Sequence, residues 1–450
     1  MPQKPLISVF TPTNEPKYLS EAYESLKVQT VKDWEWIILP NGGLKKKDFS
    51  VRKFPFLKDP RIKVEWVLAD KDNSPDGLPI GELKATACSL CTSPYHVELD
   101  HDDYLHEECL EKLLKAFDEG ADFVYSGFAE FHDKTMLPNI YAAACGWRYY
   151  PFEYNNVKYM ASNAFPPLPP WMLFIETGPN HVRSWRADKY HELGGHNRSF
   201  MAGDDYDLYM RFYNSGAKVV RIEECLYFYR YRENSENSFI KRNKAVHETV
   251  NSLYQEYVEK AFLRWCDDKN LLALDMGAYH NKPSDKRWSG VDVRQGPGVD
   301  FVADLDDPNK PWPWEDNSVG IIRAYDFIEH ISNTVHMFNE IWRVLAPDGI
   351  VIIEVPSTDD GNGRPGRGAF QDPTHRGPYF NQNSFWYYTN DNYKAFVEGL
   401  TCAFYPLRCY THYPSQFHVQ HQIPYVRAHL VALKQGMAAP PPIPSMNVPT

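Results

Sequence analysis

Hydrophobic and polar positions alternate along the first half of the chain in the manner of a parallel α/β fold. Apolar runs at residues 6–13, 34–43 and 95–100 have the length of buried strands and end in small, polar or acidic residues. Between these runs, residues 18–30 and 81–93 carry apolar side chains at helical spacing. Strands that alternate with helices predict a parallel sheet with helices packed on its faces.

The alternation stops at an aromatic and proline-rich stretch, residues 138–170, which predicts a long loop over a binding face. It starts again at residue 271 and continues to residue 356, with acidic or glycine residues at the strand ends. A charged helical passage, residues 245–265, separates the two alternating regions. Two α/β domains in succession are therefore expected.

The predicted fold class is α/β, and the same pattern sets the predicted boundaries. We place the first domain at residues 1–240, a helical linker at 241–268 and the second domain at 269–435. The remaining residues, 436–450, are rich in proline and are expected to be disordered.

Composition narrows the classes of function. The 450 residues include 48 basic and 59 acidic side chains, a net charge of −11, and they show no basic stripe of the kind that binds nucleic acid. No apolar run reaches the roughly 18 residues that span a bilayer, and the first residues lack the pattern of a signal peptide. We therefore expect a cytoplasmic protein without a transmembrane segment. The 8 cysteines lack the paired spacing of a zinc site and are expected to be buried thiols.

Three carboxylates, Asp100, Asp102 and Asp103, crowd the end of the strand predicted at residues 95–100. Ligands bind at the carboxyl ends of the strands in open α/β sheets. Carboxylates this close repel one another unless a divalent cation neutralises them, and hard oxygen ligands suit Mg²⁺ or Mn²⁺. A solvated turn in which Asp103 caps the next helix is the alternative interpretation.

Other segments of the first half, taken with this one, resemble the inverting nucleotide-sugar glycosyltransferases of family 2, which have the GT-A fold. The matching segments are ISVFTPT, DWEWIILPNGG, GELKATA, ELDHDDYL, PNHVRSWR and GDDYDLYMR, and they occur in the family's order. The resemblance covers roughly residues 5 to 235. It implies transfer of a sugar from a nucleotide-sugar donor to a hydroxyl group of a glycan or related acceptor.

The resemblance also implies which residues contact the donor nucleotide. These are expected to be Thr11, Pro12, Glu15, Asn41, Lys84 and Asp100. Asn41 departs from the family, in which an aspartate usually contacts the base. The identity of the base stays open, since an amide both donates and accepts hydrogen bonds whereas a carboxylate only accepts them.

A divalent metal, Mn²⁺ or Mg²⁺, is part of the same implied site. Asp102 is the expected ligand, with Asp103 as its rival. His181 resembles the later histidine that completes the metal shell in some members of the family. A lone histidine is more often a structural residue, and that alternative stays open for His181.

The resemblance also implies a catalytic base. Inverting transfer needs a carboxylate that takes the proton from the acceptor hydroxyl as this oxygen attacks the anomeric carbon. Asp205 is the candidate base, with Asp204 and Asp207 as supporting charges. The alternative is that Asp204 and Asp205 only cap the helix that follows them.

The second half of the chain resembles the class I, Rossmann-like methyltransferases that use S-adenosylmethionine. The matching segments are LALDMGAYHNK, WSGVDV, FVADL, WPWEDNSVGIIRAYDFIEHI and NEIWRVLAPDGIVIIEVP, over about residues 270 to 390. The later FQDPTHRGPYF resembles a segment found in a subset of these enzymes. The cofactor site implied by the resemblance consists of Asp275, Gly277, Asp292 and Asp304. His375 is a candidate base for methyl transfer, and Glu329 and His330 are further candidates for an acid or base toward a hydroxyl. The alternative is that Glu329 and His330 begin a helix and that His375 fixes a loop.

The loop that follows Gly277 departs from this family. The family usually has a second glycine there, whereas this chain has Ala278, Tyr279 and His280. A side chain at this place can block the close approach of the methionine portion of the cofactor. Two interpretations stay open, namely an altered mode of cofactor binding or the loss of methyl transfer.

Together these features predict a bifunctional sugar-modifying enzyme. The first domain is expected to be a metal-dependent inverting glycosyltransferase, and the second to O-methylate the sugar or the acceptor glycan. The alternative from another class is a glycan-binding or scaffold protein in which one or both active sites have degenerated. A nucleic-acid methyltransferase with an accessory domain fits the acidic charge poorly. The donor, the acceptor and the oligomeric state do not follow from the sequence.

Overall fold

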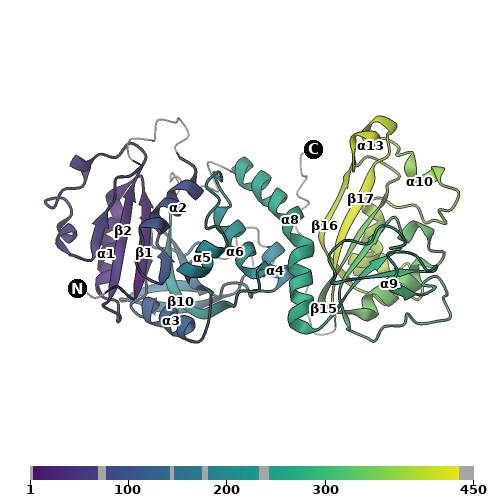
Figure 1. Ribbon diagram of the computed structural model, residues 1–450, viewed down its shortest axis with the longest axis horizontal. Coiled ribbons are helices and arrows are strands. Elements are labelled where there is room, and N and C mark those ends of the chain that lie inside the picture. The colour runs from purple at the N-terminus through teal and green to yellow at the C-terminus, as the bar shows by residue number, and fades with distance from the viewer. Residues whose placement is uncertain (1–3, 69–77, 142–145, 175–180, 233–242, 435–450) are drawn as a thin grey trace. The chain divides into compact units, whose positions relative to one another are not determined.

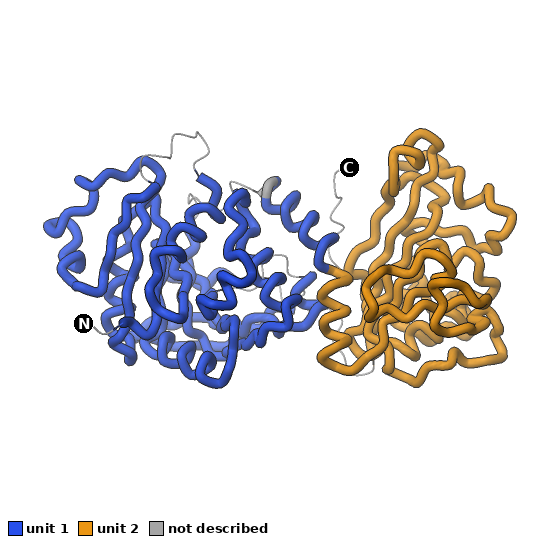
Figure 2. Tube along the Cα trace, in the orientation of Figure 1, with its two compact units in different colours: residues 1–257 blue, residues 258–450 orange. Residues whose placement is uncertain are grey.

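The computed structural model describes residues 4–68, 78–141, 146–174, 181–232 and 243–434. The chain divides into two compact units, Met1–Tyr257 (unit 1) and Val258–Thr450 (unit 2), each built around one sheet (Figure 2). Both units mix helices and strands, so the predicted α/β fold class is confirmed. The finer domain boundaries remain predictions, and the predicted disordered tail lies outside the described residues.

Unit 1 contains a 10-stranded sheet. Its strands are β1 (Ile7–Thr13), β2 (Trp34–Pro40), β3 (Ile62–Val64), β4 (Tyr95–Glu98), β5 (Tyr104–Leu105), β6 (Phe123–His132), β7 (Tyr149–Tyr154), β8 (Val157–Ser162), β9 (Arg183–Arg186) and β10 (Val219–Tyr231). They lie in the order β3-β2-β1-β4-β9-β6-β10-β5, and the pair β7 and β8 joins at β6. The neighbouring strands β1 and β2 lie side by side in Figure 1. Strands β1 to β4 run parallel, whereas β9 is antiparallel to both of its neighbours. The carboxyl ends of β1, β2 and β4 therefore share one edge.

Helices pack on both faces of this sheet. They are α1 (Leu19–Lys27), α2 (Ile80–Leu90), α3 (Cys109–Asp118), α4 (Pro169–Phe174), α5 (Ala187–Glu192) and α6 (Asp204–Asn214), with 3-10 turns at Pro16–Tyr18, Lys46–Asp48 and Pro55–Lys58. Successive strand residues point to opposite faces. Val124 therefore joins the core formed with α1 and α3, whereas the ring of Phe123 lies 5.5 Å from Tyr209 and 5.2 Å from Phe212 of α6.

The prediction of a long loop at residues 138–170 is wrong. Residues 149–162 of this stretch form the hairpin of β7 and β8, and α4 begins at Pro169. Asn155 and Asn156, both with positive φ (50° and 61°), make the two-residue turn between the strands. Asparagine tolerates this left-handed backbone, which hairpin turns of this length require. The aromatic and proline-rich composition obscured this turn signal.

Unit 2 contains a 7-stranded sheet. Its strands are β11 (Leu272–Met276), β12 (Trp288–Asp292), β13 (Phe301–Val302), β14 (Val319–Tyr325), β15 (Leu345–Pro356), β16 (Phe404–His412) and β17 (Tyr425–Ala432). The helices are α9 (Thr334–Val344), α10 (Gly368–Gln371), α11 (Trp386–Thr389), α12 (Asp391–Lys394) and α13 (Gln416–His421), with 3-10 turns at Ile328–His330 and Gln382–Phe385. A longer helix, α8 (Asn243–Lys269), spans the division between the units.

The strand order of unit 2 locates its ligand edge. The order is β13-β12-β11-β14-β15-β17-β16, in which the first five strands are parallel. The chain proceeds from β11 toward β13 on one side and from β14 to β15 on the other, so the topological switch point lies between β11 and β14. Ligands of open α/β sheets bind beyond the carboxyl ends of the strands at such a point. Within the described part of the chain, no helix is long and apolar enough to cross a membrane.

Candidate functional site

A buried ionic network lies near the edge of the unit 1 sheet where β1, β2 and β4 end, which is called the ligand edge of unit 1 below. The Lys84 Nζ of α2 lies 2.8 Å from Glu98 Oε1 and 3.2 Å from Asp204 Oδ2, and these side chains are 7%, 1% and 3% exposed. Burial opposes the charged form of Lys84, but Asp204 and Glu98 outweigh it and raise its pKa. Burial likewise disfavours the ionised form of Glu98, but Arg183 and Lys84 outweigh it and lower its pKa. The network therefore consists of charged groups that neutralise one another.

Arg183, at the start of β9, connects this network with the ligand edge. Its guanidinium donates to Glu98 at 3.2 Å, to His181 Nε2 at 2.7 Å and to Asp205. Burial and the charge of Arg183 lower the pKa of His181 well below its ordinary value, so this imidazole is neutral. His181 Nε2 also lies 3.4 Å from Asp100 Oδ2. These contacts therefore bring together residues from three segments of unit 1, namely the end of β4, the start of β9 and the start of α6.

Asp204 and Asp205 occupy different surroundings, although they are adjacent at the start of α6. The side chain of Asp204 is buried against Lys84, and His196 Nε2 lies 3.7 Å away from it. The side chain of Asp205 is 26% exposed. Of the two carboxylates, only that of Asp205 is open to a ligand.

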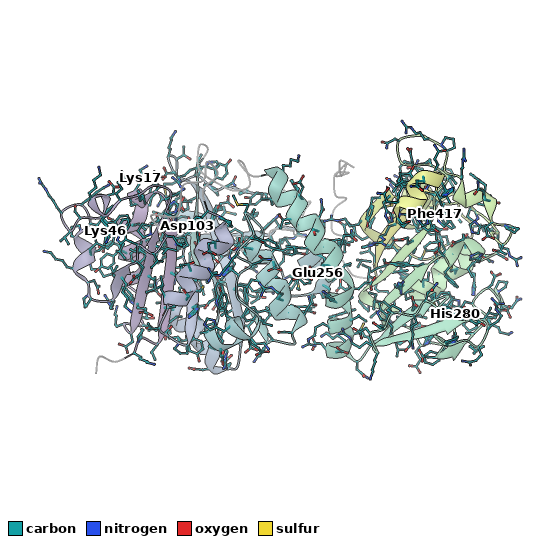
Figure 3. The ribbon with its side chains drawn as sticks, turned by 45° about the horizontal axis from the view of Figure 1, so that its top comes forward. Lys17, Lys46, Asp103, Glu256, His280 and Phe417 are labelled. Atoms are coloured by element: carbon teal, nitrogen blue, oxygen red, sulfur yellow. The ribbon has the colours of Figure 1, made fainter. Side chains whose placement is uncertain are left out.

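Asp102 and Asp103 are held by arginines at the end of β10. Asp102 Oδ2 lies 2.7 Å from Arg232 Nη2, and Arg232 also donates to Glu15 at 2.7 Å. Asp103 accepts the backbone N–H of Arg230 at 2.7 Å, while its Oδ2 is buried without a hydrogen-bond partner. Asp103 lies among the packed side chains of unit 1 (Figure 3). Among the described residues, no group of side chains with ligand atoms close enough to hold a metal ion includes Asp102, Asp103 or His181.

The residues expected to contact the nucleotide lie near this edge in several roles. The buried hydroxyl of Thr11 donates to Leu99 O at 2.7 Å and accepts from Trp36 Nε1 at 2.8 Å, which leaves it fully hydrogen-bonded inside the protein. Asn41 is buried directly after β2, Pro12 is half-buried in β1 and Glu15 pairs with Arg232. Lys84 is buried in the ionic network and is not a residue of the helix surface.

Asp207, expected as a supporting charge, does not join the site. Its Oδ2 accepts from Arg211 at 2.8 Å, and its Oδ1 accepts the hydroxyl of Tyr257 at 2.7 Å. It therefore ties α6 to the first part of α8. Conversely, the sequence-based interpretation missed Glu98, Arg183 and Arg232, although PNHVRSWR and VELD contain the first two.

Comparison with known families assigns both units. Residues 81–166 match the family model "Glycosyl transferase family 2", and residues 260–353 match a "Methyltransferase domain" model. A segment of unit 1 is therefore similar to family 2 glycosyltransferases, and a segment of unit 2 is similar to methyltransferase domains. Both predicted resemblances are thus confirmed.

Individual relatives agree with the first assignment. Chondroitin synthase of Escherichia coli is 25% identical over 218 residues, 47% of this chain and 27% of that protein, so the chain spans about a quarter of that relative's length. An uncharacterized glycosyltransferase of Methanocaldococcus jannaschii is 27% identical over 270 residues, 59% of this chain and 82% of that protein.

Solved structures of S. aureus TarS are also similar to part of the chain. TarS 1–349 aligns over 59% of this chain and 72% of its own with 13% identity and a TM-score of 0.39. Its complex with UDP-GlcNAc aligns over 59% and 73% with 14% identity and a TM-score of 0.41.

The loop after β11, which is expected to approach the cofactor, departs from the family in its sequence. Residues 277–287, all of them described, connect β11 to β12 through turns without a helix. Gly277 has a φ of +73°, a conformation that favours glycine, and Ala278 is buried with its Cβ close to Gly290. The loop whose sequence departs from the family is therefore a connection without a helix, and it packs tightly against β12.

The acidic residues of the methyltransferase domain fall into two groups. Asp292 ends β12 half-buried, and Asp304 is exposed just beyond β13. Asp275 is buried in β11, where burial raises its pKa to about 6 although Arg323 lies 3.4 Å away. The first two are open to a ligand, whereas Asp275 faces a partner within the protein. His375 lies beside His330, at 5.1 Å between ring centroids.

Proposed function

We propose that unit 1 transfers a sugar from a nucleotide-sugar donor to a hydroxyl acceptor with inversion at the anomeric carbon, in a metal-dependent reaction. The observation that carries the proposal is the partly exposed Asp205 carboxylate, held by Arg183 at the edge where Asp100 and His181 also lie. A general base must lie within reach of the hydroxyl proton that it accepts, and the Asp205 carboxylate is open to a ligand.

In the proposed reaction, the acceptor oxygen attacks the anomeric carbon from the face opposite the leaving group. A C–O bond forms to the acceptor, the bond from the anomeric carbon to the diphosphate breaks, and the nucleoside diphosphate leaves with the electron pair. Asp205 takes the hydroxyl proton. Asp204 does not reach the acceptor and instead positions α6 through Lys84.

The residues at the edge fit a hard divalent cation. Burial next to Glu98 raises the pKa of Asp100 to about 7, a sign of negative charge that the described residues leave incompletely compensated. Asp100, Asp102 and the neutral His181 offer carboxylate oxygen and imidazole nitrogen, and Asp103 is the rival ligand. When bound, Mn²⁺ or Mg²⁺ would offset the charge that develops on the leaving diphosphate.

Chelation is expected to abolish turnover of the nucleotide sugar, and added Mn²⁺ or Mg²⁺ to restore it. The measurement is release of nucleoside diphosphate from a panel of nucleotide sugars, with and without EDTA.

Asp102→Asn is expected to raise the Mn²⁺ concentration for half-maximal rate by about tenfold or more. Asp133→Asn is the matched control, because Asp133 pairs with Arg230 in the same unit but has no proposed ligand role. Full activity in EDTA would refute metal dependence, and no turnover of any donor would favour the glycan-binding alternative.

For unit 2, we propose that it binds S-adenosylmethionine and O-methylates the sugar or the acceptor glycan. Asp292 would accept hydrogen bonds from the ribose hydroxyls and Asp304 would hold the adenine amine, and both are open to a ligand. The cofactor would supply the methyl group. Because the connection after Gly277 is short, the methionine portion of the cofactor would bind in an altered way.

Calorimetric titration of the full chain with S-adenosylmethionine tests this second activity. Saturable heat is expected, and Asp292→Asn is expected to weaken binding about tenfold, the equivalent of about 1.4 kcal/mol. Asp285→Asn is the control, because Asp285 pairs with Arg287 on the surface of the same unit. Absence of heat at millimolar ligand would show that the cofactor site has degenerated.

A further inference from the structure

A cluster of two histidines and a glutamate lies beyond the carboxyl end of β14, a strand that borders the switch point of the unit 2 sheet. Glu329 and His330 belong to the 3-10 turn Ile328–His330, which follows the carboxyl end of β14. His375 comes from the segment after α10, and its neighbour Arg376 donates its backbone N–H to Glu329 O at 2.8 Å. One ligand atom of each of the three residues lies within 4.8 Å of those of the other two.

Among the described residues, none stabilises the buried carboxylate of Glu329 by a hydrogen bond. The residue is 4% exposed, and neither Oε1 nor Oε2 has a hydrogen-bond partner. An unpaired buried carboxylate is costly, and burial raises the pKa of Glu329 to about 8. Asp372 adds negative charge nearby, and among the described residues no lysine or arginine pairs with Glu329. A bound cation would remove this cost.

Hydrogen bonds to Nδ1 hold both histidines of the cluster. His375 Nδ1 lies 2.9 Å from Ala369 O, and His330 Nδ1 lies 3.3 Å from Thr374 O, so each Nδ1 carries the proton and donates to a carbonyl. The hydroxyl of Thr374 donates to Asp372 at 2.6 Å and accepts from His330 Nδ1 at 3.2 Å. With Nδ1 as the donor, Nε2 is the nitrogen of each neutral imidazole that can bind a metal. Outer hydrogen bonds of this kind fix the tautomer and orientation of histidine ligands.

We propose that Glu329, His330 and His375 form a binding site for a divalent first-row transition metal at the ligand edge of the methyltransferase domain. Two imidazole nitrogens and one carboxylate suit Zn²⁺, Fe²⁺ or Co²⁺ better than Mg²⁺ or Ca²⁺. Three protein ligands leave at least one coordination position for water or a substrate oxygen. This site is chemically distinct from the oxygen-rich site proposed for unit 1.

Spectroscopic titration of the full chain with Co²⁺ tests the site, because its visible absorption reports nitrogen ligation. Wild type is expected to bind one equivalent with imidazole-type bands, which Zn²⁺ displaces. His375→Ala and Glu329→Gln are expected to weaken this binding by more than about 100-fold, since loss of a direct ligand costs more than loss of its outer partner. Glu329→Gln keeps the shape of the side chain, so it guards against a variant that fails to fold.

Two controls separate this site from the rest of the chain. His421→Ala removes an exposed histidine of α13 in the same unit, and Asp102→Asn alters the site proposed for unit 1. Both are expected to retain the Co²⁺ bands. The proposal is wrong if wild type binds no Co²⁺ in this form, or if the bands survive in both His375→Ala and Glu329→Gln. The titration contains no S-adenosylmethionine and no nucleotide sugar, so its result does not depend on either proposed activity.

Discussion

Replacement of Asp205 by asparagine is expected to lower the turnover of sugar transfer by roughly 10² to 10⁴-fold, the range supplied by a positioned general base. The amide cannot accept the proton of the acceptor hydroxyl. Its carbonyl can still accept a hydrogen bond from Arg183, so Glu98 and the buried network keep their partner. Affinity for the nucleotide sugar should therefore change little. The measurements are turnover in a transfer assay and the dissociation constant of the donor by calorimetry.

Asp188→Asn is the matched control for this prediction. Asp188 lies in the first turn of α5 and pairs with Arg186, as Asp205 lies in the first turn of α6 and pairs with Arg183. Asp188 is 68% exposed and lies outside the proposed site. Its replacement should leave turnover unchanged. Retention of most of the turnover by Asp205→Asn would remove Asp205 as the base.

The fold class and the two families could be predicted because their signals are local. Apolar runs of strand length and helical spacing in segments such as residues 18–30 survive in the structure as β1, α1 and β2. The motifs of both domains are likewise short contiguous strings, so their order was readable without knowledge of the packing. The hairpin at Asn155 and Asn156 was missed, because composition was given more weight than the turn residues.

The connections between the site residues could not be predicted, because they depend on packing between distant segments. Lys84 has the position of a helix surface residue in the sequence, and only the fold brings Glu98 and Asp204 to it. Glu329, His330 and His375 were each noted as acid or base candidates. Their convergence follows from the placement of the segment after α10 against the end of β14. Sequence spacing carries no signal for either arrangement.

Replacement of Lys84 by methionine is expected to have the largest effect on stability. Methionine keeps much of the side-chain volume but leaves Glu98 and Asp204 buried without this cation. Removal of one partner from a buried ion pair costs about 3–5 kcal/mol, because the remaining charge is uncompensated. Arg183 still pairs with Glu98, so the folded state should survive. The measurement is the free energy of unfolding in urea; the two units can unfold in separate transitions, of which only that of unit 1 should move.

Lys112→Met is the matched control, because Lys112 of α3 also contacts two carboxylates. These are Glu108 and Glu224, which are 46% and 59% exposed. Exposed ion pairs contribute about 0–1 kcal/mol, so this variant should be nearly as stable as wild type.

Loss of the Lys84 charge also raises the pKa of Glu98. The destabilisation of Lys84→Met should therefore shrink as the pH falls and Glu98 becomes protonated. Equal stability losses in the two variants would mean that the network of Lys84, Glu98 and Asp204 does not hold unit 1 together.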